Sequence, residues 1–286
     1  MALSPVKPFS EGRSTYETAR IILLGIPLDV TVSSRPGTRF APSAIRESSW
    51  SLEDYNYLTD EDILEVPFFD LGDLILKGDL NDGLNEIRRA IREILKDKKA
   101  PVSIGGEHLI TLPIIQAMKE VYPDLQVMIF DAHADLSDSF RKMPLSHANV
   151  LKGVYDIVGG SNMYLFGTRA GTKGDKELIK KEIFSSYRPP LTTAIEELKG
   201  GLKNKPIYIS IDMDILDPSS APGVTTPEVL GWGYEQLYET MRGFSGLKIV
   251  GADLTEISPH YDIAGTTSLA GASLVREILF LLARSL

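Results

Sequence analysis

The sequence predicts an α/β fold in which helices cover both faces of a mainly parallel sheet. Two observations predict it. Short apolar runs of strand length alternate with amphipathic helical patterns along the chain, and no Gly/Ser/Pro-rich linker divides the 286 residues. Parallel strands that are buried on both faces form continuous apolar runs of this kind. A chain of this length can bury a large core, so we expect a single domain over residues 1–286.

The expected elements follow from these patterns in chain order. The apolar runs predict strands at residues 21–26, 63–71, 102–104, 127–129, 163–166, 207–211 and 247–252. Apolar positions that recur at helical spacing predict a helix around residues 84–95, and two more helices are expected at 228–242 and 273–283. The polar residues 1–19 are expected to form an arm that helps assembly, or else a frayed end.

Acidic residues and histidines directly follow three of the expected strands. They are His108 after strand 102–104, then Asp131, His133 and Asp135 after strand 127–129, and Asp212 and Asp214 after strand 207–211. Residues two apart in an extended chain point to one face, so the middle three side chains are expected to converge. Ligands bind at the carboxyl edge of parallel sheets. These six side chains therefore predict a metal site.

The type of metal follows from the donor atoms. A lone aspartate after a strand often caps the next helix, which is the alternative for Asp131 and Asp214, but three clusters favour metal binding. Four carboxylates and two imidazoles, in a chain without cysteine, are too many and too anionic for a four-coordinate structural zinc site. Two cations that share bridging aspartates would balance the charge. Mn²⁺ suits carboxylate-rich octahedral coordination, Fe²⁺ or Co²⁺ could substitute, and Zn²⁺ is less favoured.

These motifs resemble the signatures of the ureohydrolase family, the arginases and agmatinases. The three signatures are at residues 105–108, 131–135 and 210–218, with an extension at 221–228; residues 251–259 resemble the late glutamate motif and 35–46 the N-terminal loop. Glu107 stands where the family more often has aspartate. This difference changes no metal ligand, but it affects a contact made to one of the ligands. The resemblance implies the arginase fold, a three-layer α/β/α sandwich, in subunits that usually assemble as trimers or hexamers.

The resemblance also implies the ligands of two Mn²⁺ per chain. One ion would be bound by His108, Asp131, Asp135 and Asp212, and the other by Asp131, His133, Asp212 and Asp214. Asp131 and Asp212 would then bridge the ions. A water between two such cations loses a proton near neutral pH and becomes a strong nucleophile.

Two further residues are implied to act on the substrate. His147 alone would be a loop or first-turn histidine, but a family histidine at this place passes a proton to the leaving amine, a task that suits an ordinary histidine pKa. Glu256 alone would be a surface carboxylate, but the family glutamate at this place pairs with the substrate guanidinium. His260 is expected to be a structural or entrance residue and no ligand.

Two loops indicate the branch of the family. Its arginases carry an asparagine soon after the Asp-x-His-x-Asp motif and an Asn-x-His-Gly-type motif at the shuttle histidine. The corresponding residues here are Leu136-Ser137-Asp138 and Leu145-Ser146-His147-Ala148, which resemble the agmatinase branch. The expected reaction is cleavage of agmatine to putrescine and urea, a step of polyamine synthesis. Arginase, guanidinobutyrase or formiminoglutamase activity, or a non-catalytic metal-binding protein, remains open.

Composition argues against several other classes. The net charge of −9 and the pI near 5.1 argue against nucleic-acid binding, which needs a basic face. The apolar run 278–283 is too short to span a bilayer, and residues 1–19 lack the apolar segment of a signal peptide. The absence of cysteine fits a reducing cytoplasm, where we expect the protein. A dinuclear metallophosphoesterase would need a Gly-Asn-His motif, which the chain lacks.

Overall fold

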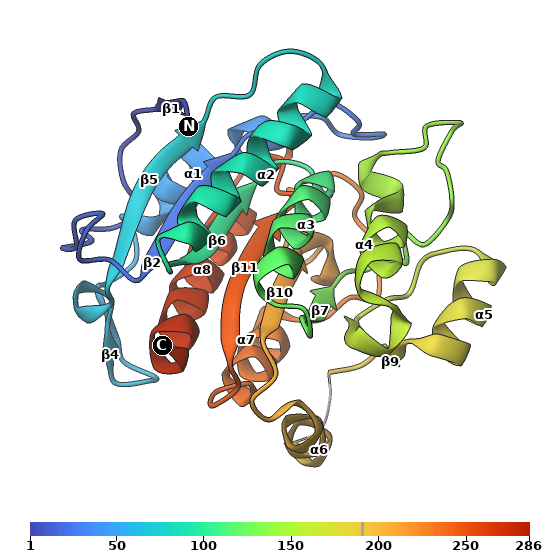
Figure 1. Ribbon diagram of the computed structural model, residues 1–286. Coiled ribbons are helices and arrows are strands. Elements are labelled where there is room, and N and C mark those ends of the chain that lie inside the picture. The colour runs from blue at the N-terminus through green and yellow to red at the C-terminus, as the bar shows by residue number, and fades with distance from the viewer. Residues whose placement is uncertain (190–191) are drawn as a thin grey trace.

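A nine-stranded sheet forms the centre of the computed structural model, which describes residues 1–189 and 192–286 (Figure 1). The strand order is β1-β5-β2-β6-β11-β10-β7-β8-β9, and β1 against β5 is the antiparallel pair. The strands are Leu3–Ser4 (β1), Ile21–Ile26 (β2), Phe68–Leu74 (β5), Ala100–Gly105 (β6), Gln126–Phe130 (β7), Met163–Phe166 (β8), Phe184–Ser186 (β9), Ile207–Asp212 (β10) and Ile249–Thr255 (β11). A separate small hairpin pairs Tyr55–Asn56 (β3) with Glu61–Asp62 (β4).

Helices cover both faces of this sheet (Figure 1). One layer contains Leu80–Lys96 (α2), Thr111–Val121 (α3), Val150–Val158 (α4) and Lys173–Glu182 (α5). The other contains Ala41–Ser49 (α1), Thr192–Leu202 (α6), Tyr234–Gly243 (α7) and Thr266–Ser285 (α8). Short 3₁₀ helices lie at Thr38–Phe40, Ile63–Glu65, His108–Ile110, His147–Asn149, Gly160–Asn162, Met213–Ile215 and Pro259–Tyr261. The predicted α/β/α sandwich with a mainly parallel sheet is confirmed.

The alternation of side chains along a strand explains why the core has two halves. In β10, Ile207 and Ile209 pack with the α7 and α8 layer, whereas Tyr208 between them packs with the α2 and α3 layer. All six residues of this strand are buried, as expected for a central parallel strand. The continuous apolar runs of the sequence are therefore core strands.

Some predicted boundaries are wrong, and the structure shows why. The run 63–71 begins as a 3₁₀ helix, since the Asp62 side chain accepts a hydrogen bond from Leu64 N, and β5 starts at Phe68 after Pro67. The helix predicted from residue 228 begins at Tyr234. The preceding loop packs so closely that a Cβ at Gly231 would lie 2.4 Å from Asp217 N. The first residues are not frayed, because β1 pairs with β5.

The C-terminal helix α8 is a core helix. Among the described residues it is long and apolar enough to cross a membrane by length and composition, but 67% of its most apolar window is buried inside the fold. It packs over β11 on one face of the sheet (Figure 1). Burial of this kind is typical of a helix that covers a sheet.

Candidate metal centre and active site

The carboxyl ends of four neighbouring strands form the site. Strands β6, β11, β10 and β7 are consecutive in the sheet. Their register pairs Leu254 with Ile104, Asp212 with Thr255, and Ile211 with Phe130. Residues that follow these strands therefore meet at one edge, although they are far apart in the sequence.

Two groups of potential metal ligands lie at this edge, and Asp131 belongs to both. The first group is His108, Asp131 and Asp212, and the second is Asp131, His133 and Asp214. His108 Nδ1 lies 3.1 Å from Asp131 Oδ2 and 3.3 Å from Asp212 Oδ2. His133 Nδ1 lies 2.8 Å from Asp214 Oδ2 and 3.7 Å from Asp131 Oδ1. The two carboxylate oxygens of Asp131 thus face different ligand groups: Oδ2 faces the first group and Oδ1 the second.

Asp135 stands outside these two groups. The extended geometry that the sequence predicted through this residue is wrong, because β7 ends at Phe130 and the backbone turns. His133 N donates a 2.5 Å hydrogen bond to Asp131 Oδ1, and Asp135 has a φ of +45°. Asp135 still lines the same cavity as His133 and Asp212.

Unsatisfied polar atoms show that the first ligand group fits a cation. His108 Nδ1 and Asp131 Oδ2 are buried and face each other without hydrogen-bond alignment. Burial raises the pKa of Asp212 well above its usual range, and the nearby charges of Asp214 and Asp131 raise it further. Clustered, buried carboxylates with unpaired oxygens are costly in a protein interior unless positive charge balances them.

Glu256 and His147 lie beside the ligand groups and are both buried. Glu256 follows β11 with a φ of +67°; its Oε1 accepts a 2.6 Å hydrogen bond from His108 N, and its Oε2 accepts one from Thr225 Oγ1. His147 Nδ1 lies 3.7 Å from the same Oε1. Burial raises the pKa of Glu256 to about 7. Glu256 is therefore no surface carboxylate.

The pKa of His147 also differs from the sequence-based expectation. Burial, with the positive charges of His108 and His133, lowers it to about 4. The ring is therefore neutral at pH 7. The residue lies in the first turn of a short helix, as its surrounding sequence indicated.

An acidic cavity of about 260 Å³ opens over this site. It is lined by Ser33, His133, Ala134, Asp135, Ser137, Phe140, His147, Ala148, Ala170, Gly171, Thr172, Asp175, Asp212 and Thr226. Three aspartates are among these residues, and no lysine or arginine of the described chain is. The cavity favours a positively charged ligand.

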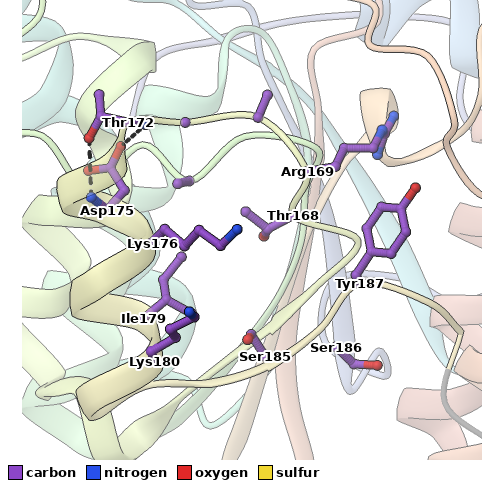
Figure 2. Close-up of a pocket in the computed structure, with 13 residues that line it drawn as sticks. Thr168, Arg169, Thr172, Asp175, Lys176, Ile179, Lys180, Ser185, Ser186 and Tyr187 are labelled. Carbon is purple, nitrogen blue, oxygen red and sulfur yellow. Dashed lines mark hydrogen bonds between the residues drawn. The ribbon is translucent and has the colours of Figure 1, made fainter.

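A second cavity of about 270 Å³ shares the segment 170–172 and Asp175 with the first. Figure 2 shows Lys176 extending into it from α5, with Arg169 at the opposite side. Arg169 Nη2 donates 2.8 Å hydrogen bonds to the carbonyl oxygens of Asp214 and Glu228. Arg169 therefore supports the loop that carries Asp214, a role that no sequence motif indicated.

The other residues at the rim are less directly involved. His260 is exposed, and its ring lies 4.8 Å from that of Phe40, outside both ligand groups. The Thr225 hydroxyl, in contrast, touches Glu256. Thr225 lies within the extension of the third motif at residues 221–228, so the sequence contained a signal for this residue that was not interpreted.

Comparisons with known proteins agree with this geometry. The family model described as the arginase family matches residues 19–281. An agmatinase of Bacillus cereus is 38% identical over 276 residues, which cover 96% of this chain and 95% of that protein. A guanidinobutyrase of Pseudomonas aeruginosa is 34% identical over 292 residues, covering 96% and 90%. The crystal structure of a putative agmatinase from Clostridium difficile has a TM-score of 0.87 at 35% identity and covers 94% of this chain and 99% of that one.

Proposed function

Because this chain belongs to the arginase family, an amidinohydrolase family, we propose that it hydrolyses agmatine to putrescine and urea. The acidic cavity is the observation on which this choice of substrate rests. Agmatine has a positive charge at each end and no carboxylate. Beside the proposed metal ligands Asp135 and Asp212, the cavity offers Asp175, and it has no lining lysine or arginine in the described chain to pair with a carboxylate. Near-full-length similarity to an agmatinase supports the same choice.

We propose two Mn²⁺ ions as the cofactor. His108, Asp131, Asp135 and Asp212 would hold one, and Asp131, His133, Asp212 and Asp214 the other. The two ligand groups that share Asp131 support this arrangement, and their carboxylate-rich donor set suits Mn²⁺. When bound, such ions act as Lewis acids and lower the pKa of water toward neutrality.

Glu256 and His147 would handle the substrate and the proton. The Glu256 carboxylate, buried beside the ligand groups, would accept hydrogen bonds from the guanidinium. Water adds its oxygen to the guanidinium carbon, and the bond from that carbon to the substituted nitrogen breaks. His147, neutral at pH 7, would give its ring proton to the leaving amine nitrogen, and the proton that the water loses would replace it.

We also propose the assembly, the location and the partners of the enzyme. The family resemblance supports a homo-oligomer, a trimer or hexamer, of single-domain subunits spanning residues 1–286. The chain contains no cysteine and carries a net charge of −9, which supports a cytoplasmic enzyme with a small-molecule substrate and neither a nucleic-acid nor a membrane partner. Production of putrescine would place the reaction in polyamine synthesis.

A urea-release screen of the Mn²⁺-loaded protein over agmatine, arginine and guanidinobutyrate tests the proposal. We expect kcat/KM for agmatine to exceed that for arginine by roughly 100-fold or more, because a buried, unpaired carboxylate costs several kcal/mol and each 1.4 kcal/mol is about tenfold in rate. Faster turnover of guanidinobutyrate would favour the second candidate, which the Pseudomonas aeruginosa relative supports. Equal or faster turnover of arginine would contradict the choice of agmatine.

A further inference from the structure

The loop after β2 reaches the site and contacts His147 at two points. His147 N donates a 2.9 Å hydrogen bond to the hydroxyl of Thr31. Ser33 N donates a 3.1 Å hydrogen bond to His147 Nε2. One loop thus holds both the backbone and the ring of the residue proposed to carry the proton.

Glu107 holds this loop in turn. Its Oε2 accepts 2.7 Å hydrogen bonds from Val30 N and Thr31 N, and its Oε1 accepts one of 2.7 Å from the Thr31 hydroxyl. Glu107 is fully buried, and Thr31 is 7% exposed. The Thr31 hydroxyl therefore donates to Glu107 and accepts from His147, and it links the two.

The fit between this loop and the end of β6 is close. Gly106 N donates to Ile26 O, and Glu107 N donates to Leu28 O at 2.8 Å. A Cβ at Gly106 would lie 2.1 Å from Leu28 O, so glycine is required here by close approach of the backbones. The segment that carries Glu107 therefore lies directly against this loop.

The contact from Ser33 determines which ring nitrogen of His147 carries the proton. In a neutral imidazole one nitrogen is a donor and the other an acceptor. Because Nε2 accepts from Ser33 N, the proton belongs on Nδ1, which lies 3.7 Å from Glu256 Oε1. The hydrogen bond made by one nitrogen thus sets the state of the other.

We propose that Thr31 is a positioning residue for the reaction: its hydroxyl, held by Glu107, keeps His147 in the orientation and tautomer whose Nδ1–H faces Glu256. This inference rests on the proposed role of His147 in proton transfer. Glu107, at the position where the family more often has aspartate, is the acceptor on which the arrangement depends.

Substitution of Thr31 tests the role of its hydroxyl. Thr31→Val removes the hydroxyl at nearly constant shape, and Thr31→Ser retains it. We expect the Val variant to lower kcat for agmatine by roughly 10- to 100-fold, part of the range of acid–base catalysis, with KM within about twofold and metal content unchanged. The Ser variant should restore most of the activity. Thr240→Val, which removes a buried hydroxyl that bonds within α7, is the matched control and should match the parent.

The tautomer provides a readout that does not require activity. In metal-free protein with ¹⁵N-labelled imidazoles, NMR at pH 7 should show His147 of the parent with its proton on Nδ1, and a mixture of tautomers in Thr31→Val. The chain has four histidines, so the signals can be assigned with single substitutions. If Thr31→Val fails to fold, Glu107→Gln replaces it, since an amide NH₂ placed among the loop donors should disturb His147 in the same way.

Several results would overturn the inference. They are an unchanged kcat in a folded Thr31→Val protein, a Ser variant as impaired as the Val variant, or a parent His147 protonated on Nε2. Failure of the proposed function is distinguishable, because the parent would then release no urea from agmatine while the NMR measurement still decides the tautomer.

Discussion

At the scale of single residues, each carboxylate of the site contacts a different ligand group or a different backbone N–H. Asp131 faces both ligand groups, Asp214 accepts from Ala132 N at 3.0 Å, and Glu256 accepts from His108 N. The residue types and their positions after strands were readable from the sequence, because strand ends are local features. The burial of Glu256 and its contact with Thr225 were not, because they depend on how distant segments meet.

Replacement of His147 by alanine separates proton transfer from metal binding. We expect kcat to fall by roughly 10- to 10,000-fold, a broad range around that of general acid catalysis, while the metal content stays near that of the parent. The reason is that His147 belongs to neither ligand group. Metal analysis beside steady-state kinetics measures both quantities. Loss of metal from the variant would mean that His147 is a ligand.

Glu256→Gln should weaken the hold on the guanidinium, which agmatine and arginine share. A neutral amide loses the charge-assisted hydrogen bonds of a carboxylate. We expect kcat/KM to fall for both substrates while their ratio stays within about twofold, which corresponds to only a few tenths of a kcal/mol. A large change of the ratio would indicate that Glu256 contacts the end of the substrate where the two compounds differ.

At the scale of elements, strands were predicted better than helix starts. The run 163–166 coincides with β8, because a buried strand is defined by its own apolar residues. The start of α7 was missed because the residues before it form a loop that packs against Asp217. In this loop Leu230 has a φ of +62° and Gly231 lies close to the backbone of Asp217. Helix α8 carries a buried glutamate, Glu277, which its apolar surroundings did not indicate.

Glu277 makes the stability of the α8 layer depend on pH. Burial raises its pKa above 4.5; Arg276 and Arg284 act to lower it, and Glu61 raises it. Asn56 Nδ2 donates to its Oε1 at 2.5 Å, and its Oε2 has no hydrogen-bond partner. A raised acid pKa in the folded state means that the stabilisation is fully present below the unfolded pKa and is lost as pH rises through the folded one.

Glu277→Gln should therefore raise the Tm relative to the parent at pH 7 to 8, by about 2 °C. The difference should shrink as pH falls toward 4, where the parent carboxyl is protonated. Thermal unfolding of metal-free protein across this pH range measures it. Glu235→Gln, an exposed position on α7, is the control and should show no such trend. A variant less stable than the parent at pH 8 would contradict the reasoning.

At the scale of the whole molecule, the sheet gathers negative charge at one edge. Neighbouring strands β7, β10, β11 and β6 all end there, so their carboxylates repel one another in a poorly solvated place. The order of these strands is not readable from local patterns, because β10 and β11 lie between β7 and β6 in the sheet although both come later in the chain. Convergence of the motifs was inferable from chemistry, and the family resemblance implied that Asp131 is shared. The fold adds that Asp131 Oδ2 faces His108 and Asp131 Oδ1 faces His133.

Metal binding should stabilise the entire fold, because it neutralises this edge. A ligand that binds the folded state alone adds about 2.7 kcal/mol at a concentration 100 times its Kd, which is roughly 5 °C in Tm for a chain of this size. We expect Mn²⁺ to raise the Tm of chelated protein in a concentration-dependent way and to restore activity in parallel, with about two ions bound per chain.

Asp131→Ala should lose the Tm response and the activity together, since the Asp131 carboxylate faces both groups. Asp156→Ala, which removes a surface carboxylate paired with Lys152, should keep both. Full activity of the chelated parent, or an undiminished Mn²⁺ response in Asp131→Ala, would exclude a dinuclear centre built on Asp131.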